Sequence, residues 1–207
     1  DHWGVKHDVL CAGKESTYKF VEDIVDELCE LFPDKYFHIG GDEVPKHRWH
    51  LCTHCQVMMK KLGLNNEDEL QCCFMNRIND YCVGKNKQAF MWSWDLKDDM
   101  LLSENLGFTK CGDINTGGRP FIDTSSKAYY IDLPYGYISL KDTANHKLYD
   151  GNCLGAEATL WTEYVPDMKK ADKMTYPRLG AMCETVWRGE NSYEQFHNKL
   201  DYYYSYL

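Results

Sequence analysis

The chain has 207 residues, which is enough for one substantial hydrophobic core. Its 32 acidic and 23 basic residues give a net charge of −9, which argues against nucleic acid or an anionic membrane as its main partner. A hydrophobic content of 43% excludes a disordered chain, and since no run of about 18 apolar residues occurs, we expect no membrane span.

The first predicted elements are a helix, a strand and a glycine bend. Apolar side chains recur at three- and four-residue spacing over residues 16–31, which predicts an amphipathic helix ended by Pro33. The short apolar run 36–39 predicts a buried strand, and Gly40-Gly41 predicts a tight bend at its end.

Two further helices and a strand are predicted next. Periodic apolar residues over 46–62, followed by Gly63, predict a helix with a glycine stop. The next helix begins after Asn66, with Glu69 placed as in a capping box. The apolar and aromatic run 88–94 predicts a second strand.

The second half of the chain predicts strands followed by helices. Strands are expected at 108–114, 127–133 and 154–161, and a long loop at 112–126. A helix is expected from Pro177 to Trp187, and another over 193–207. This alternation of short apolar strands with helices predicts parallel βα units, which is an α/β fold.

The ten cysteines are predicted to be mostly free thiols, because the chain carries long periodic segments rather than a short, loop-rich scaffold. Cys52 and Cys55 form a CxxC motif just after His47 and His50. A zinc site needs about four converging ligands and no second CxxC follows, so core or surface thiols are the favoured interpretation. A redox role for this motif stays open. We expect no metal and no cofactor.

The run Gly40-Gly41-Asp42-Glu43 is the strongest candidate for catalysis. Functional groups of parallel α/β folds gather at the carboxyl ends of strands, and glycines let a substrate approach the backbone. Two adjacent carboxylates repel, so one of them is expected to hold a proton and to serve as a general acid. The alternative is a polar strand exit that caps the following helix.

Aromatic residues with a neighbouring carboxylate recur near other strand ends. The pairs are Trp94 with Asp95, Tyr130 with Asp132, and Trp161 with Glu163. An aromatic face packs on a sugar ring while its hydroxyls donate to the acids, so three such pairs favour a carbohydrate site. Core packing is the alternative for each aromatic residue.

Residues 38–43, His-Ile-Gly-Gly-Asp-Glu, resemble the signature of the β-N-acetylhexosaminidases of glycoside hydrolase family twenty. Other stretches resemble the family in the same order: 9–15, 31–33, 49–56, 70–71, 94–95, 130–132, 160–163 and 177–178. The resemblance therefore covers nearly the whole chain.

The resemblance implies a (β/α)₈ TIM barrel in which the signature closes the fourth strand. Residues 1–207 are then expected to be a single portion of the catalytic domain, a partial barrel with strands four to eight. Strands one to three, with the family arginine that binds sugar hydroxyls, are expected to be missing along with the natural N-terminus.

The resemblance also implies a retaining exo-β-N-acetylhexosaminidase that uses substrate-assisted catalysis through an oxazolinium intermediate. Glu43 would be the acid and base, and Asp42 would hold the acetamido N–H. The implied binding residues are Trp94 and Trp161 as the acetamido wall, Tyr130 as donor to the acetamido oxygen, and Asp132 and Glu163 for ring hydroxyls. The stretch 110–115 lacks a pocket tryptophan that the family usually has.

The expected partner is a terminal β-linked N-acetylhexosamine, GlcNAc or GalNAc, of a glycan or glycoconjugate. The alternative is a non-catalytic carbohydrate-binding or truncated remnant, whose open sheet edges predict self-association or pairing with the missing N-terminal part. The cysteine pattern slightly favours a reducing, cytoplasmic compartment, whereas the family also includes secreted and lysosomal proteins.

Overall fold

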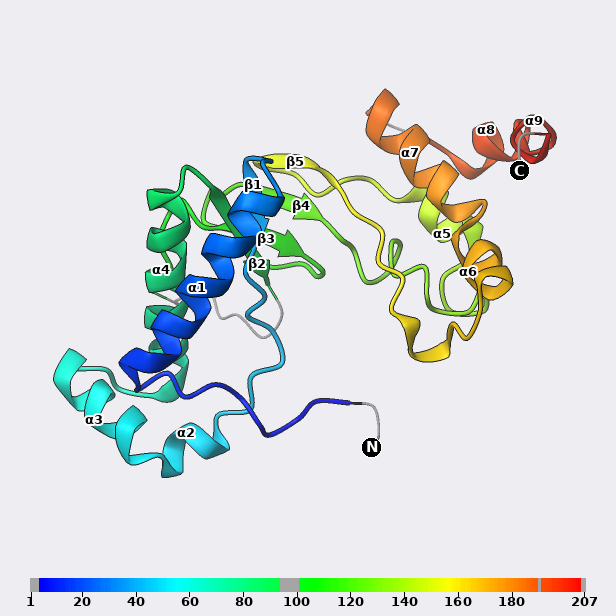
Figure 1. The fold of residues 1–207 in the computed structure, drawn as a ribbon. Coiled ribbons are helices and arrows are strands. Elements are labelled where there is room, and N and C mark those ends of the chain that lie inside the picture. Colours follow the sequence, from blue (N-terminus) through cyan, green and yellow to red (C-terminus); the bar gives the residue numbers. More distant parts are fainter. Residues whose placement is uncertain (1–3, 94–100, 190, 206–207) are drawn as a thin grey trace. The chain divides into compact units, whose positions relative to one another are not determined.

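The computed structural model describes residues 4–93, 101–189 and 191–205 (Figure 1). Five strands form one sheet in the order β1-β2-β3-β4-β5, the same order as along the chain. Strand β1 pairs with β2 in parallel, and β4 pairs with β5 in parallel. Helices separate β1 from β2 and β4 from β5, so the prediction of an α/β fold with parallel strands is confirmed.

The chain divides into two compact units. The first comprises residues 1–108 with 114–120, and the second comprises 109–113 with 121–207. Strand β3 (Gly107–Lys110) has residues in both. The other elements of the first unit are α1 (Glu15–Leu31), β1 (Tyr36–His38), α2 (His47–Leu51), α3 (Thr53–Leu62), α4 (Glu67–Gly84) and β2 (Gln88–Trp92).

In the first unit, α4 packs against both α1 and β2. Helix α1 ends at Leu31, as the proline at position 33 predicts. The rings of Tyr18 and Phe74 join α1 to α4 with centroids 4.9 Å apart. Tyr36 pairs with Gln88 in the register between β1 and β2, which leaves the residues after β1 at the carboxyl edge of the sheet.

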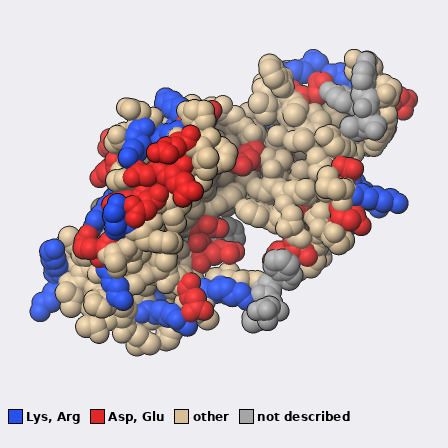
Figure 2. All heavy atoms as spheres, viewed as in Figure 1, with Lys and Arg blue, Asp and Glu red and all other residues tan. Residues whose placement is uncertain are grey.

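Acidic side chains gather along α1, where Figure 2 shows them among lysine and arginine side chains. Arg77 of α4 pairs with Glu15 at 2.7 Å, and Lys85 pairs with Asp26 at 2.7 Å. Exposed ion pairs contribute little to stability, typically below about 1 kcal/mol each. The acidic side chains of α1 therefore form a solvated helix face, and two of them pair with Arg77 and Lys85 at α4.

The predicted helix over 46–62 is wrong in one respect, because it is two helices broken at Cys52. Cys52 is extended, with φ −83° and ψ 116°, and it begins α3. Gly63 ends α3 in the left-handed conformation, as predicted. Asn66 caps α4 by accepting from the backbone N–H of Glu69 at 3.0 Å.

The second unit continues the βα alternation after β3. Its elements are β4 (Phe121–Asp123), α5 (Leu140–Asn145), β5 (Cys153–Ala156), the 3₁₀ turn η1 (Thr162–Tyr164), α6 (Met168–Thr175), α7 (Arg178–Arg188), α8 (Tyr193–His197) and α9 (Leu200–Tyr204). Helix α7 packs on α5, α6 and β5, and buries Ala181 against Ala144 and Phe196. Among the described residues, no helix has the length and apolar character that a membrane crossing needs.

Two strand predictions are wrong here. The predicted strand 127–133 is a turn with a single bridge from Tyr130 to Thr159, and the strand β4 lies inside the predicted loop 112–126. The carboxylate of Asp123 accepts from the backbone N–H of Ser125 at 3.0 Å and turns the chain directly after β4. This local side-chain bond outweighs the strand propensity of the tyrosines.

The predicted C-terminal boundaries also shift. Strand β5 is shorter than the predicted run 154–161, and Pro177 stands before α7 rather than at its first turn. The described part of the periodic segment 193–207, residues 193–205, forms two short helices, α8 and α9, rather than one.

Candidate active site

Asp42 and Glu43 follow β1 directly, at the carboxyl end of the sheet. The ladder to β2 runs past His38, because the N–H of Ile39 donates to Phe90 O at 2.8 Å. The N–H of Trp92 donates to Gly40 O at 3.0 Å. The strand end is thus fixed up to the residue before the Gly41-Asp42-Glu43 turn.

The turn itself requires glycine. Gly40 and Gly41 have φ +71° and +100°, values that L side chains rarely adopt. A Cβ on Gly41 would lie 2.8 Å from Met75 Cε and 2.9 Å from Met91 Cε. Glu43 also has a positive φ, 49°, which is uncommon for a residue other than glycine.

A side chain from α4 holds this turn. Gln71 Nε2 donates to the carbonyl oxygen of Gly41 at 2.7 Å. The N–H of Gly40 donates to His38 Nδ1 at 3.1 Å, so the proton of a neutral His38 is on Nε2. Asp42 is half-buried and Glu43 is exposed, so the second carboxylate is open to a ligand.

The second unit brings Tyr130 and Trp161 together. The N–H of Thr159 donates to Tyr129 O, and the N–H of Ile131 donates to Thr159 O, both at 2.9 Å. This bridge places the Tyr130 and Trp161 rings 6.3 Å apart at 58°. Trp161 is 42% exposed, so it is not a core tryptophan in this unit.

Asp132 is a buried carboxylate in the same region. Its Oδ1 atom has no hydrogen-bond partner among the described residues, although the residue is only 8% exposed. Burial raises the pKa of Asp132 above its ordinary value, and the Glu163 carboxylate raises it further. Backbone N–H groups and the Arg178 guanidinium act in the opposite direction. A buried acceptor without a partner is costly unless a ligand satisfies it.

Arg178 fastens the segment that carries Asp132. Its guanidinium is fully buried and donates to four backbone carbonyls, those of Ile131, Leu133 (2.8 Å), Ile138 (2.9 Å) and Met174 (2.7 Å). It also lies 4.2 Å from the centre of the Tyr135 ring. The sequence assigned Arg178 no role, and its only signal was the family-like pair Pro177-Arg178.

The predicted site residues thus fall into two groups. Asp42 and Glu43 lie together in the first unit. The second unit contains the remaining described members, which are Tyr130, Asp132, Trp161 and Glu163. Trp94 and its neighbour Asp95 lie outside the described residues.

Comparison with known proteins adds the family. Residues 1–190 match the family described as glycosyl hydrolase family 20, catalytic domain. A β-hexosaminidase of Porphyromonas gingivalis is 33% identical over 96% of this chain, which spans 29% of that relative's length. The roles of the site residues in this chain stay predictions.

Solved structures share the fold. A β-N-acetylhexosaminidase from Bacteroides fragilis matches with a TM-score of 0.77 and 26% identity, over 95% of this chain and 45% of its own. An exo β-N-acetylglucosaminidase from Vibrio harveyi, solved in complex with N-acetylglucosamine, matches with a TM-score of 0.83 and 22% identity, over 94% of this chain and 35% of its own. The chain belongs to glycosyl hydrolase family 20 and is a homologue of its β-hexosaminidases.

Proposed function

We propose that this chain carries the acid–base machinery of a retaining exo-β-N-acetylhexosaminidase, which removes terminal β-linked GlcNAc or GalNAc through an oxazolinium intermediate. The observation that carries the proposal is the Asp42-Glu43 pair at the carboxyl end of β1, within a match to the family's catalytic domain. We further propose that β1 to β5 correspond to strands four to eight of the family's barrel, since the chain matches a third to a half of its structural relatives.

In the first step the acetamido oxygen of the substrate attacks the anomeric carbon. Glu43 gives its proton to the glycosidic oxygen as the bond to the leaving sugar breaks. In the second step Glu43 takes a proton from water, the water oxygen bonds to the anomeric carbon, and the bond from that carbon to the acetamido oxygen breaks. The Asp42 carboxylate accepts a hydrogen bond from the acetamido N–H, and this bond orients the acetamido oxygen for attack. The negative charge of Asp42 also offsets the positive charge of the oxazolinium ring. The exposure of Glu43 leaves its carboxyl accessible to the glycosidic oxygen of a bound substrate.

The second unit supplies the sugar-binding residues in this proposal. Trp161 and Trp94 form the acetamido wall, and the hydroxyl of Tyr130 donates to the acetamido oxygen. Asp132 and Glu163 bind ring hydroxyls. The Oδ1 atom of Asp132 supports this role, because a sugar hydroxyl would give this buried acceptor the partner that it lacks in the described chain.

The test is hydrolysis of chromogenic β-GlcNAc and β-GalNAc substrates by the full-length protein and by residues 1–207. We expect Glu43→Gln and Asp42→Asn each to lower kcat by at least about 100-fold, in the range of a lost acid–base or electrostatic contact. Glu30→Gln, which changes an exposed carboxylate on α1, is the matched control. Turnover that survives Glu43→Gln would reject the assigned acid.

A non-catalytic carbohydrate-binding protein is the second candidate. The exposed Trp161 and the unpartnered Oδ1 atom of Asp132 would serve this candidate equally well, because both can bind a sugar without acid–base chemistry. Calorimetric titration with GlcNAc separates the two candidates. Binding without turnover in the full-length protein supports the second candidate, and turnover in that protein supports the first.

A further inference from the structure

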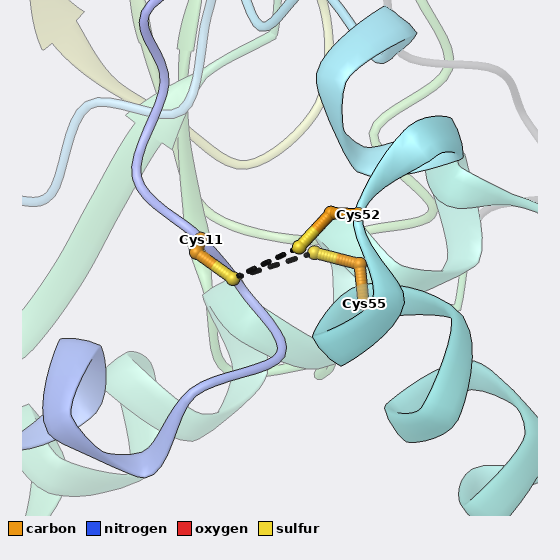
Figure 3. A group of neighbouring side chains, drawn as sticks. All are labelled: Cys11, Cys52 and Cys55. Atoms are coloured by element: carbon orange, nitrogen blue, oxygen red, sulfur yellow. Dashed lines mark hydrogen bonds between the residues drawn. The ribbon is translucent and has the colours of Figure 1, made fainter.

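Three cysteine sulfurs converge in the first unit. Cys11 lies in the loop before α1, Cys52 at the start of α3, and Cys55 in the first turn of α3 (Figure 3). The Sγ atom of Cys11 lies 3.6 Å from that of Cys52 and 3.7 Å from that of Cys55. All three sulfurs lie within 4.8 Å of one another.

These distances fit a tetrahedral metal ion. Zinc–thiolate bonds of about 2.3 Å at tetrahedral angles put neighbouring sulfurs about 3.8 Å apart. A disulfide needs about 2.05 Å, and all ten cysteines of the chain are free thiols. Thiols that share weak hydrogen bonds also lie at such distances. Two further observations favour a metal site over hydrogen-bonded thiols: three sulfurs converge on one point, and other contacts fix the backbone around them.

Contacts from α1, α2 and α3 hold the loop that contains Cys11 in place. The indole Nε1 of Trp49 donates to Leu10 O, and the hydroxyl of Tyr18 donates to Ala12 O, both at 2.8 Å. A Cβ on Gly13 would lie 2.2 Å from the backbone carbon of His54, so this glycine permits a direct contact of loop and helix. The backbone around all three sulfurs is therefore positioned by other contacts.

The two cysteines at the start of α3 have different surroundings. The backbone N–H groups of Cys55 and His54 lower the pKa of the Cys52 thiol. Cys55 is fully buried in the small core formed with Ala12, Trp49, Met59 and Leu70. Burial favours the neutral thiol of Cys55 and raises its pKa to about 12, so a metal ion would have to displace this proton on binding.

Two histidines line a pocket beside Cys52, but neither ring lies within 4.8 Å of all three sulfurs, so a ligating imidazole would have to move toward them. A pocket of about 560 Å³ is lined by Cys52, Leu51, Arg48, His7 and His47. Neutral imidazole is a common partner of three thiolates in structural zinc sites. His50 is a weaker candidate, because its Nδ1 already lies 3.0 Å from Glu67 Oε1.

We propose that Cys11, Cys52 and Cys55 bind one Zn²⁺ ion, with His7 or His47 as the fourth ligand. The ion is structural, since four protein ligands leave no open position for substrate. It ties the loop before α1 to the start of α3. This assignment departs from the sequence-based expectation of no metal, in which only the CxxC motif was visible.

The test is metal content and cobalt spectroscopy on the full-length protein, loaded with Zn²⁺ or Co²⁺ under reducing conditions and then dialysed. We expect one zinc per chain and the absorption bands of tetrahedral cobalt–thiolate coordination. Cys11→Ser, Cys52→Ser and Cys55→Ser should each lower the zinc content at least about 10-fold. Cys183→Ser, at an exposed cysteine of α7, is the control that should keep it.

The histidine variants and alkylation complete the test. His7→Ala or His47→Ala, whichever removes the ligand, should shift the cobalt bands. Zinc should slow alkylation of Cys11, Cys52 and Cys55 but not of Cys183, and this readout needs no variant that folds poorly. Less than about one zinc per ten chains, zinc that survives Cys52→Ser in a folded protein, or equal alkylation with and without zinc would each overturn the proposal.

Discussion

At the residue scale, the catalytic turn depends on glycines for two separable reasons. Gly40 and Gly41 both have positive φ, but only Gly41 also has no room for a side chain, because Met75 and Met91 lie against it. Apart from its two chain neighbours, no described residue has a heavy atom within 4 Å of the position that a Cβ on Gly40 would take. The pair therefore separates the cost of backbone strain from the cost of a steric clash.

We expect Gly40→Ala to lower the free energy of unfolding by about 1–2 kcal/mol, the usual cost of a left-handed alanine. Gly41→Ala should cost up to about 1 kcal/mol more, because the ends of the buried Met75 and Met91 side chains must move as well. Urea denaturation of both variants measures the difference. Equal losses would show that Met75 and Met91 yield without cost.

Asp132 illustrates a residue whose surroundings oppose its charge. Burial raises the pKa of the folded carboxyl above its ordinary value of 3.8, so the folded state binds the proton more tightly than the unfolded state. The free energy of unfolding therefore falls as the pH rises from the ordinary pKa of 3.8 through the higher pKa of the folded state. Below both pKa values the carboxyl is protonated in both states, and it does not affect the pH dependence of stability.

We therefore expect Asp132→Asn to raise the free energy of unfolding at pH 7, with a gain that shrinks as the pH falls toward 4. The same variant should weaken GlcNAc binding if Asp132 binds ring hydroxyls as proposed. Urea denaturation across this pH range measures the first effect, and Asp150→Asn, at an exposed aspartate, should change stability by less than about 0.5 kcal/mol. A gain that is constant with pH would contradict the argument.

At the element scale, periodicity and glycine placement predict elements whose contacts are local. The run 36–39 followed by Gly40-Gly41 predicts both the strand β1 and the location of Asp42 and Glu43 at its end. Helices α1 and α4 follow in the same way, from apolar spacing and from the cap at Asn66.

Elements that depend on distant partners were not predictable in this way. The break at Cys52 accompanies a contact with Cys11, 41 residues earlier, which the helical spacing of 46–62 does not register. Buried Asp123 ends β4 by binding Ser125 locally and His146 at 2.9 Å from 23 residues away. The tyrosine-rich sequence at 127–133 predicts a strand, but the hydrogen bonds of Asp123 hold the preceding residues in a turn, and 127–133 form turns with a single bridge at Tyr130.

The same limit explains why the candidate site was only partly predictable. The acidic and aromatic residues were visible because they stand next to strand ends in sequence. Arg178 was not, because the carbonyls of Ile131, Leu133 and Ile138 that it binds lie 40 to 47 residues earlier. Gln71 was likewise visible only as part of a family-like stretch, since its partner Gly41 is 30 residues away.

At the scale of the whole molecule, each of the two compact units has its own buried clusters. Ala12, Trp49, Cys55, Met59 and Leu70 form one in the first unit. Ala128, Tyr129 and Met182 form another in the second, beside the cluster of Ala144, Ala181 and Phe196. A local defect is therefore expected to loosen the unit that contains it before the other.

Arg178→Lys tests this expectation. A lysine keeps the charge but cannot reach four carbonyls, so buried acceptors lose their donor and we expect a loss of about 3 kcal/mol or more. Hydrogen exchange measured by mass spectrometry should rise across 131–138 and α7, while exchange in α1 and α4 stays unchanged. Arg188→Lys, at an exposed arginine of the same helix, is the matched control. If exchange rises equally in both units, they unfold as one cooperative structure, and the separate cores do not set separate stabilities.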